Sequence, residues 1–257
     1  MARSIWNGTI VFGLVAVPIK VHSATESKTV HFREVHAKDG SKIEHRRICP
    51  KHRGLYEVDH DDIVKGYEVS KGKWVELTDD EMAAAAGSQS RRIEIEHFVP
   101  LDDVDPVYYE RPYYLGAQDE GRDAYALLHA ALDRAGRAGV GRWVFHNRER
   151  TVLLRPLEDV LVIHTMRFAD EVVDPGEFEL GRVRRKPSDR EIKMASSLVD
   201  GLHTDFDPSE YEDGYRADVL DLVERKAAGK NIELPADEEP EAADDLLAAL
   251  EASLANA

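Results

Sequence analysis

The feature that most constrains the fold is a succession of short β-type segments separated by turn residues. Residues 5–35 are rich in Val, Ile and Thr, and 29–35 alternates between apolar and polar side chains as a half-buried strand does. Similar segments follow at 63–69, 74–77, 92–98, 107–115, 142–145, 152–154 and 160–168. Many short strands at this spacing predict a barrel or a sandwich.

One helix is predicted inside the β-rich region. Over 121–135, Ala124, Leu128 and Leu132 fall on one face, and Gly136 can end the helix in the left-handed conformation. The predicted fold class is therefore α+β and mainly β.

Two amphipathic helices are predicted near the C-terminal end. Ser188 and Glu191 form a capping box at the start of the first, and Asp207 and Pro208 mark the start of the second, which runs to about 226. Their apolar stripes must cover a barrel of the same chain or another subunit. The stripe residues are Ile192, Val199, Leu202, Tyr211, Tyr215, Val219 and Leu222.

Charge is unevenly distributed along the chain. The formal net charge is −16, which by itself disfavours a nucleic-acid partner. However, the tail from 231 onward holds eight acidic residues and no Lys or Arg, whereas 33–53 holds seven basic residues against three acidic ones. The basic stretch predicts contact with phosphates. A second basic cluster just before Ser188 opposes the helix dipole, so helix stability does not explain it.

The motifs of common enzymes are absent from the sequence. It contains no phosphate-binding loop, no H-E-x-x-H and no G-x-S-x-G, and Gly139-Val140-Gly141 leads into a strand rather than a helix. The acidic pairs at 61–62 and 102–103 leave a Mg²⁺-dependent nuclease as an alternative. Solvated turns are the simpler interpretation of such pairs, so we expect neither an enzyme nor a cofactor.

The single cysteine limits the metal chemistry. His45, Cys49 and His52, with His60 beyond them, could surround zinc, but the spacing matches no established template and a second Cys pair is missing. We therefore predict no metal, with these residues as the only candidates. One cysteine also excludes an intrachain disulfide and is typical of the cytoplasm. The apolar run at 10–19 is too short to span a membrane, and no cleavage motif of a signal peptide follows it.

Several motifs resemble the prokaryotic Ku proteins. The opening Ser4-Ile5-Trp6-Asn7-Gly8-Thr9-Ile10 is similar to the start of that family, as is the long motif His164-Thr165-Met166-Arg167-Phe168-Ala169-Asp170-Glu171-Val172. Further matching motifs lie at 12–15, 17–18, 23–26, 30–36, 64–68, 113–115, 154–156 and 186–191. The similarity covers about 2–232, and the acidic end lies outside it.

The resemblance implies an architecture with two parts. A β-barrel core over 1–186 would carry a DNA-encircling bridge at about 36–60 and one packed helix at 121–135. A helical arm at 187–232 would embrace the partner in a homodimer. Residues 233–257 lie outside the resemblance, and their own composition predicts an acidic and flexible tail, or a short amphipathic helix through the leucines.

The same resemblance implies a function in DNA repair. A two-fold ring would bind double-stranded DNA ends without reading sequence, in non-homologous end joining in the cytoplasm at the nucleoid, and would recruit the ATP-dependent DNA ligase D. A protein-interaction scaffold that never touches DNA is the alternative. The expected DNA contacts are Lys20, Lys28, Arg33, Lys38, Lys42, Arg46, Arg47, Arg142, Arg167, Arg184, Arg185 and Lys186.

Overall fold

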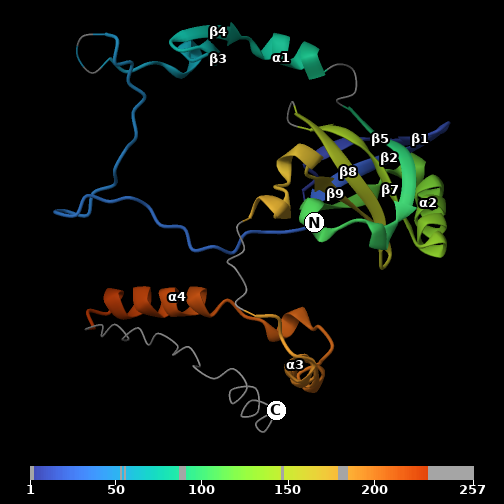
Figure 1. The fold of residues 1–257 in the computed structure, drawn as a ribbon. Helices are drawn as coiled ribbons and strands as arrows, with labels where there is room; N and C mark the ends of the chain where they lie inside the picture. The colour runs from blue at the N-terminus through green and yellow to red at the C-terminus, as the bar shows by residue number, and fades with distance from the viewer. Residues whose placement is uncertain are drawn as a thin grey trace. The chain divides into compact units, whose positions relative to one another are not determined.

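The computed structural model describes residues 3–52, 54, 56–86, 91–145, 148–178 and 185–230 (Figure 1). The chain divides into two compact units. The first contains Met1–Ser27 and Arg33–Glu177, and the second contains Lys28–Phe32 and Phe178–Ala257. Within the described residues, no helix is long and apolar enough to cross a membrane.

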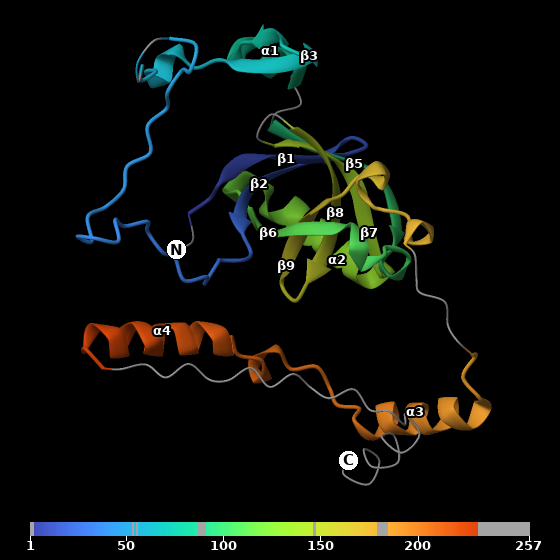
Figure 2. The ribbon, with the colours of Figure 1, turned by 60° about the vertical axis from the view of Figure 1, so that its left-hand side comes forward.

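The first unit is built on a closed β-barrel. Its strands are β1 (Trp6–Phe12), β2 (Val15–Ser23), β5 (Arg92–Pro100), β6 (Tyr109–Ala117), β7 (Arg137–Phe145), β8 (Arg148–Leu157) and β9 (Val160–Met166). They follow the order β1-β2-β6-β9-β8-β7-β5 around the barrel (Figure 2). All neighbours are antiparallel except β1 and β5, whose parallel pairing closes the sheet. The barrel interpretation of the strand pattern is therefore confirmed.

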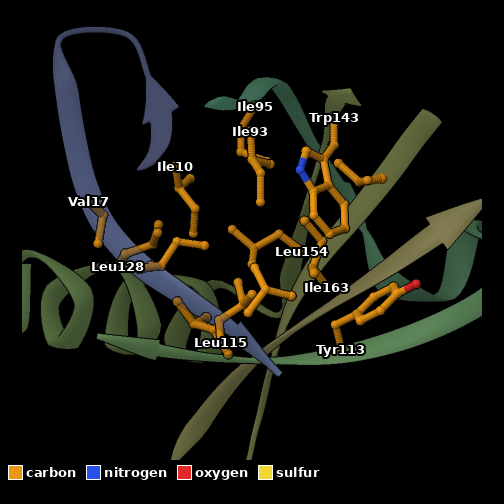
Figure 3. Packing of buried hydrophobic residues seen from close by; sticks show 14 of the residues in the cluster. Ile10, Val17, Ile93, Ile95, Tyr113, Leu115, Leu128, Trp143, Leu154 and Ile163 are labelled. Carbon is orange, nitrogen blue, oxygen red and sulfur yellow. The ribbon is translucent and has the colours of Figure 1, made fainter. Parts of the chain in front are cut away.

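Inward-facing side chains of the barrel form one apolar core. Trp143 is fully buried, and its ring stacks on Phe145 and meets the edges of Trp6 and Tyr113. Figure 3 shows Trp143 and Tyr113 among the buried residues of this core. Leu154 and other aliphatic residues complete the cluster. Because side chains alternate between the two faces of a strand, each strand contributes every second residue to this core.

Helix α2 (Arg122–Ala135) covers one side of the core, where the apolar periodicity predicted a helix. Its residues Leu128 and Leu132 are buried, and Gly136 ends the helix with φ of 60°. The Tyr125 hydroxyl donates to the carbonyl oxygen of Leu115 at 2.6 Å and accepts from the Leu161 amide at 2.7 Å. These bonds fix the helix to strands β6 and β9.

Gly141 lies where two strands approach closely. A Cβ atom at this position would stand 1.9 Å from the carbonyl oxygen of Glu94 on β5. The register between β5 and β7 shifts beside it, between Ile95 and His97. The glycines at 139 and 141 therefore serve strand packing, in agreement with the rejection of a phosphate cradle.

A long excursion leaves the barrel between β2 and β5. It contains the isolated bridges Val35↔Lys42 and Ile48↔Glu57, the hairpin of β3 (Lys65–Ser70) and β4 (Lys73–Leu77), and helix α1 (Asp79–Ala86). The predicted strand at 29–35 was wrong, since within the described residues only Val35 of that segment pairs with another strand. An alternating pattern yields a strand only where a neighbour supplies hydrogen bonds.

Helix α1 was not predicted, although its start carries a local signal. Thr78 and Glu81 form a capping box: the Thr78 amide donates to the Glu81 carboxylate at 2.8 Å, and the Glu81 amide donates to Oγ1 of Thr78 at 3.2 Å. Short 3-10 turns occur at His60–Asp62, Leu101–Asp103, Pro106–Tyr108, Asp119–Gly121, Ala169–Glu171, Pro175–Glu177 and Pro208–Glu210.

The second unit contains the two remaining helices, α3 (Asp189–Gly201) and α4 (Gly214–Ala227). The Ser188–Glu191 capping box begins α3 as predicted. The predicted start of the next helix at Pro208 was wrong, because Pro208–Glu210 makes only a 3-10 turn. Asp213 caps α4 instead by accepting from the Arg216 amide at 2.9 Å, so Tyr211 lies before the helix.

Candidate nucleic-acid interface

The basic stretch predicted at 33–53 lies in the excursion between β2 and β5. Of its described residues, all are exposed except Cys49, which is half-buried. Four of the predicted DNA contacts lie in this segment: Lys38, Lys42, Arg46 and Arg47. Such an exposed chain cannot bury apolar area against a core of its own, so its side chains are available to another molecule.

A tight turn shapes the tip of this segment. The Asp39 carboxylate accepts from the amide and the hydroxyl of Ser41, and Gly40 adopts φ of 71°. These two bonds, with a further one from His36, hold the pKa of Asp39 below its ordinary value. The Asp39 carboxylate is thus bound within the turn. Lys38 and Lys42 lie beside it, and the described part of the chain shows no ion pair for either of them.

Other charges in the excursion are partly compensated. Arg46 lies 3.3 Å from the Glu57 carboxylate, and His45 lies 2.8 Å from that of Glu34. Nη1 of Arg47 lies 2.8 Å from Nδ1 of His60. All these contacts are exposed, and exposed pairs contribute little free energy, so an incoming phosphate can replace them.

The structure does not bring the metal candidates together. His45 pairs with Glu34, whereas the His52 ring packs against Tyr56 with the ring centroids 4.9 Å apart. Among the described residues, no group of three or more His, Cys, Asp or Glu side chains is placed to hold a metal ion.

On the barrel, the predicted cations have different surroundings. Lys20 is exposed on the outer face of β2. Arg142 on β7 lies between two carboxylates, 2.9 Å from Glu96 and 3.6 Å from Glu149. Arg167 donates to the carbonyl oxygens of Val107 and Tyr109, which ties the end of β9 to the start of β6. Arg142 and Arg167 therefore already have structural partners.

The remaining predicted cations lie elsewhere in the chain. Lys28, Arg33 and Lys186 are exposed. Arg185 forms a two-point ion pair with Glu191 at the start of α3. Arg184 lies outside the described residues.

The predicted arm residues lie on surfaces that their own unit leaves largely open. On α3, Ile192 and Val199 are exposed, the latter by 70%. Tyr215 on α4 is 76% exposed, while Val219 and Leu222 are half-buried. Leu202 and Tyr211, which flank the helices, are exposed as well. The contact of these residues with a second subunit stays a prediction.

One cationic cluster was not predicted. Arg3, Arg111 and Arg150 line a single pocket of about 620 Å³ in the first unit. These arginines are far apart in the sequence, and none of them stands in a basic run. Only strand register could have identified them, because Arg111 and Arg150 continue the inward-facing positions of β6 and β8.

Comparison with known proteins agrees with this architecture. Residues 11–194 match the family model described as the Ku70/Ku80 beta-barrel domain. The chain belongs to the Ku family. It is 42% identical to the "Non-homologous end joining protein Ku" of Anaeromyxobacter sp. (strain K), over all of this chain and 86% of that protein.

Other Ku relatives are similar over comparable lengths. The protein of the same name from Mycobacterium tuberculosis (strain CDC 1551 / Oshkosh) is 37% identical over 98% of this chain and 94% of its own length. That of Bacillus subtilis (strain 168) is 34% identical over 98% of this chain and 81% of its own. The Ku match spans the excursion between β2 and β5 and reaches the start of α3.

Proposed function

We propose that this Ku-family chain is a non-enzymatic protein that binds double-stranded DNA ends in non-homologous end joining, as a homodimer that encircles the duplex. Its relatives carry the name "Non-homologous end joining protein Ku". The observation that carries the proposal is the segment 33–53 within the excursion between β2 and β5 of a Ku-family chain. This segment holds seven basic residues against three acidic ones, and its described residues are exposed except Cys49.

The charge distribution supports DNA as the partner despite the net charge of −16. A ring needs positive charge only on the surface that faces the duplex, and 33–53 concentrates such charge. Eight of the acidic residues lie at 233–251, away from it in sequence. Contacts of Lys and Arg with phosphates release counterions, so affinity should fall steeply with salt and should not depend on sequence.

Incomplete local packing supports the homodimer. Every residue of the β3–β4 hairpin is exposed, and an isolated two-stranded hairpin is only marginally stable in water. The apolar residues of α3 and α4 are likewise open. A second copy that packed against these elements would bury both sets of side chains, and closed two-fold assemblies are the commonest oligomers.

A closed ring would explain specificity for ends. A duplex can enter a ring only where it terminates, so recognition needs no contact with base edges. The role in end joining also implies that the DNA-bound protein recruits an ATP-dependent DNA ligase, the multifunctional ligase D. We place this function in the cytoplasm at the nucleoid, and it requires no cofactor.

The decisive experiment compares two forms of the same DNA. A linear duplex should bind tightly, and the same molecule covalently closed into a circle should bind weakly, in a gel-shift assay at fixed salt. Linearising the circle with a nuclease should restore binding. Equal affinity for both forms would rule out the ring, and a monomeric mass by sedimentation would rule out the homodimer.

A scaffold that never touches DNA is the second candidate, favoured by the overall acidity and by the open apolar stripes of α3 and α4. It predicts a homodimer or a hetero-complex without any mobility shift of linear or circular DNA. The gel-shift comparison therefore separates the two candidates.

A further inference from the structure

At one end of the barrel, the inward-facing positions of two strands change from apolar to charged residues. On β6, Tyr113 and Leu115 point into the core, and Arg111 is the next inward position. On β8, Val152 and Leu154 point inward, and Arg150 continues that row. The apolar core thus ends in arginine side chains rather than in further aliphatic ones.

These arginines line a pocket at the mouth of the barrel. Its lining comes from the starts of β1, β6 and β8 and from the ends of β2, β7 and β9, which meet at the same end. The volume is about 620 Å³, within the range of sites for small ligands. The lining residues are Arg3, Ser4, Ile5, Ser23, Glu110, Arg111, Tyr113, Phe145, Arg150 and Thr165.

The pocket has an excess of positive charge. Three arginines face one carboxylate, that of Glu110, which accepts from Nη1 of Arg150 at 2.6 Å. Nε of Arg150 is buried and has no hydrogen-bond partner in the described part of the chain. One carboxylate therefore satisfies only part of the cationic lining. Arg150 is partly buried, whereas Arg3 and Arg111 are exposed at the pocket opening, where an anion can reach them.

The geometry also holds the guanidinium groups in place. Arg111 lies over the ring of Tyr113, 5.9 Å from its centroid. Below this layer, Tyr113 and Phe145 pack edge to face, with the ring centroids 5.9 Å apart. Guanidinium groups gathered in this way form a donor set that recognises phosphate oxygens.

We propose that the mouth of the barrel binds a phosphate monoester through Arg3, Arg111 and Arg150. The ligand is a nucleoside monophosphate or the 5′-phosphate at the end of a DNA strand, which share this chemistry. The site goes beyond the proposed function, because binding of a small phosphate ester requires neither the dimer nor the basic excursion.

Calorimetric titration of the full-length protein with dAMP at constant ionic strength tests the proposal. We expect saturable binding, no binding of adenosine, and a loss of at least roughly tenfold in affinity in Arg111→Gln. The matched control is Arg137→Gln, an exposed arginine at the opposite end of β7, which should bind as the wild type does. Since Arg3 precedes β1, Arg3→Gln removes a pocket charge with little risk to the barrel, and its affinity should fall as well.

Absence of saturable dAMP binding by the wild type would overturn the proposal, and so would equal affinities of Arg111→Gln and Arg137→Gln. Linear duplexes with 5′-phosphate or 5′-hydroxyl ends identify the source of the phosphate. If Arg111→Gln weakens binding of the phosphorylated duplex alone, the strand end occupies the site. If Arg111→Gln lowers the affinity for dAMP but leaves binding of both duplexes unchanged, a free nucleotide does, and equal weakening of both duplexes would contradict a site for the terminal phosphate. The titration with dAMP requires no DNA, so it can detect binding of the phosphate ester even if the protein does not bind DNA ends.

Discussion

Arg185 and Glu191 form a two-point ion pair across the first turn of α3. Nη1 of Arg185 donates to Oε2 of Glu191 at 2.7 Å, and Nη2 donates to Oε1. The same carboxylate accepts from the amide of Ser188 at 2.8 Å and from its hydroxyl at 2.7 Å. Arg185 stands before the N-terminus of α3, where a positive charge interacts unfavourably with the helix dipole. The Glu191 carboxylate of the capping box compensates this charge.

This relationship predicts an acid-sensitive start of α3. The bonds from Arg185, followed by those from Ser188, hold the pKa of Glu191 well below its ordinary value of 4.5. A lowered pKa in the folded state contributes stability above the ordinary value, and this contribution is lost as the pH falls below it. In Glu191→Gln, hydrogen exchange at 189–201 should be faster at neutral pH and lack this acid-dependent component. Lys193→Gln is the matched control, and exchange equal to that of Glu191→Gln would contradict the role of the pair.

Trp143 should dominate the stability of the barrel. Its side chain is fully buried among Trp6, Tyr113 and Phe145, so Trp143→Ala should lower the free energy of unfolding by about 3–5 kcal/mol. Trp74 on β4 is 60% exposed, and Trp74→Ala should change it by less than about 0.5 kcal/mol. Urea unfolding of the two variants checks this difference, and similar losses would place the core elsewhere.

His164 should make the barrel sensitive to mild acid. Its side chain is only 9% exposed, and burial, with a smaller effect of the positive charge of Arg155, lowers its pKa from 6.5 to about 4. Nε2 of His164 accepts from Nε of Arg155 at 3.2 Å, a bond that protonation would break.

Because the folded-state pKa is the lower one, the unfolded chain takes up this proton first, and stability falls as the pH drops from 6.5 towards 4. At about 1.4 kcal/mol per pKa unit, the loss reaches at most about 3.5 kcal/mol. The difference in unfolding free energy between wild type and His164→Gln should change with pH over this window. A constant difference would show that folding does not lower the pKa of this imidazole.

Charge reversal in the excursion should abolish DNA binding without affecting the dimer. Arg46→Glu combined with Arg47→Glu inverts two exposed charges whose partners, Glu57 and His60, are exposed as well. We expect a loss of at least roughly a hundredfold in affinity for linear duplex, since each phosphate contact contributes an appreciable share of the binding free energy. Sedimentation should show an unchanged mass.

The matched control for this pair is Arg122→Glu with Arg134→Glu, which inverts two exposed charges on α2. It lowers the net charge equally, so it separates a local contact from a general electrostatic effect. Loss of binding in both double variants would remove the excursion from the DNA interface.

Local signals in the sequence were sufficient for much of this protein. The apolar spacing at 121–135 matches α2 at Arg122–Ala135, and Ser188 with Glu191 marks the start of α3. The strand segments at 92–98, 107–115, 142–145, 152–154 and 160–168 reappear as barrel strands, and those at 63–69 and 74–77 as the β3–β4 hairpin. The motif resemblance agrees with the family match over 11–194. These features depend on residues close together in the chain, where propensity, capping and turn chemistry act directly.

Tertiary structure decided what depends on distant residues. The alternation at 29–35 forms no strand, because in the described residues its pairing is limited to a single bridge from Val35 to Lys42. Arg142, by contrast, is paired because β5 and β8 place carboxylates beside it. Arg111 and Arg150 share a pocket only because β6 and β8 end at the same mouth of the barrel. The register of the strands and the positions of opposite charges depend on the pairing of segments that are far apart in the sequence. A local sequence pattern carries no information about that pairing.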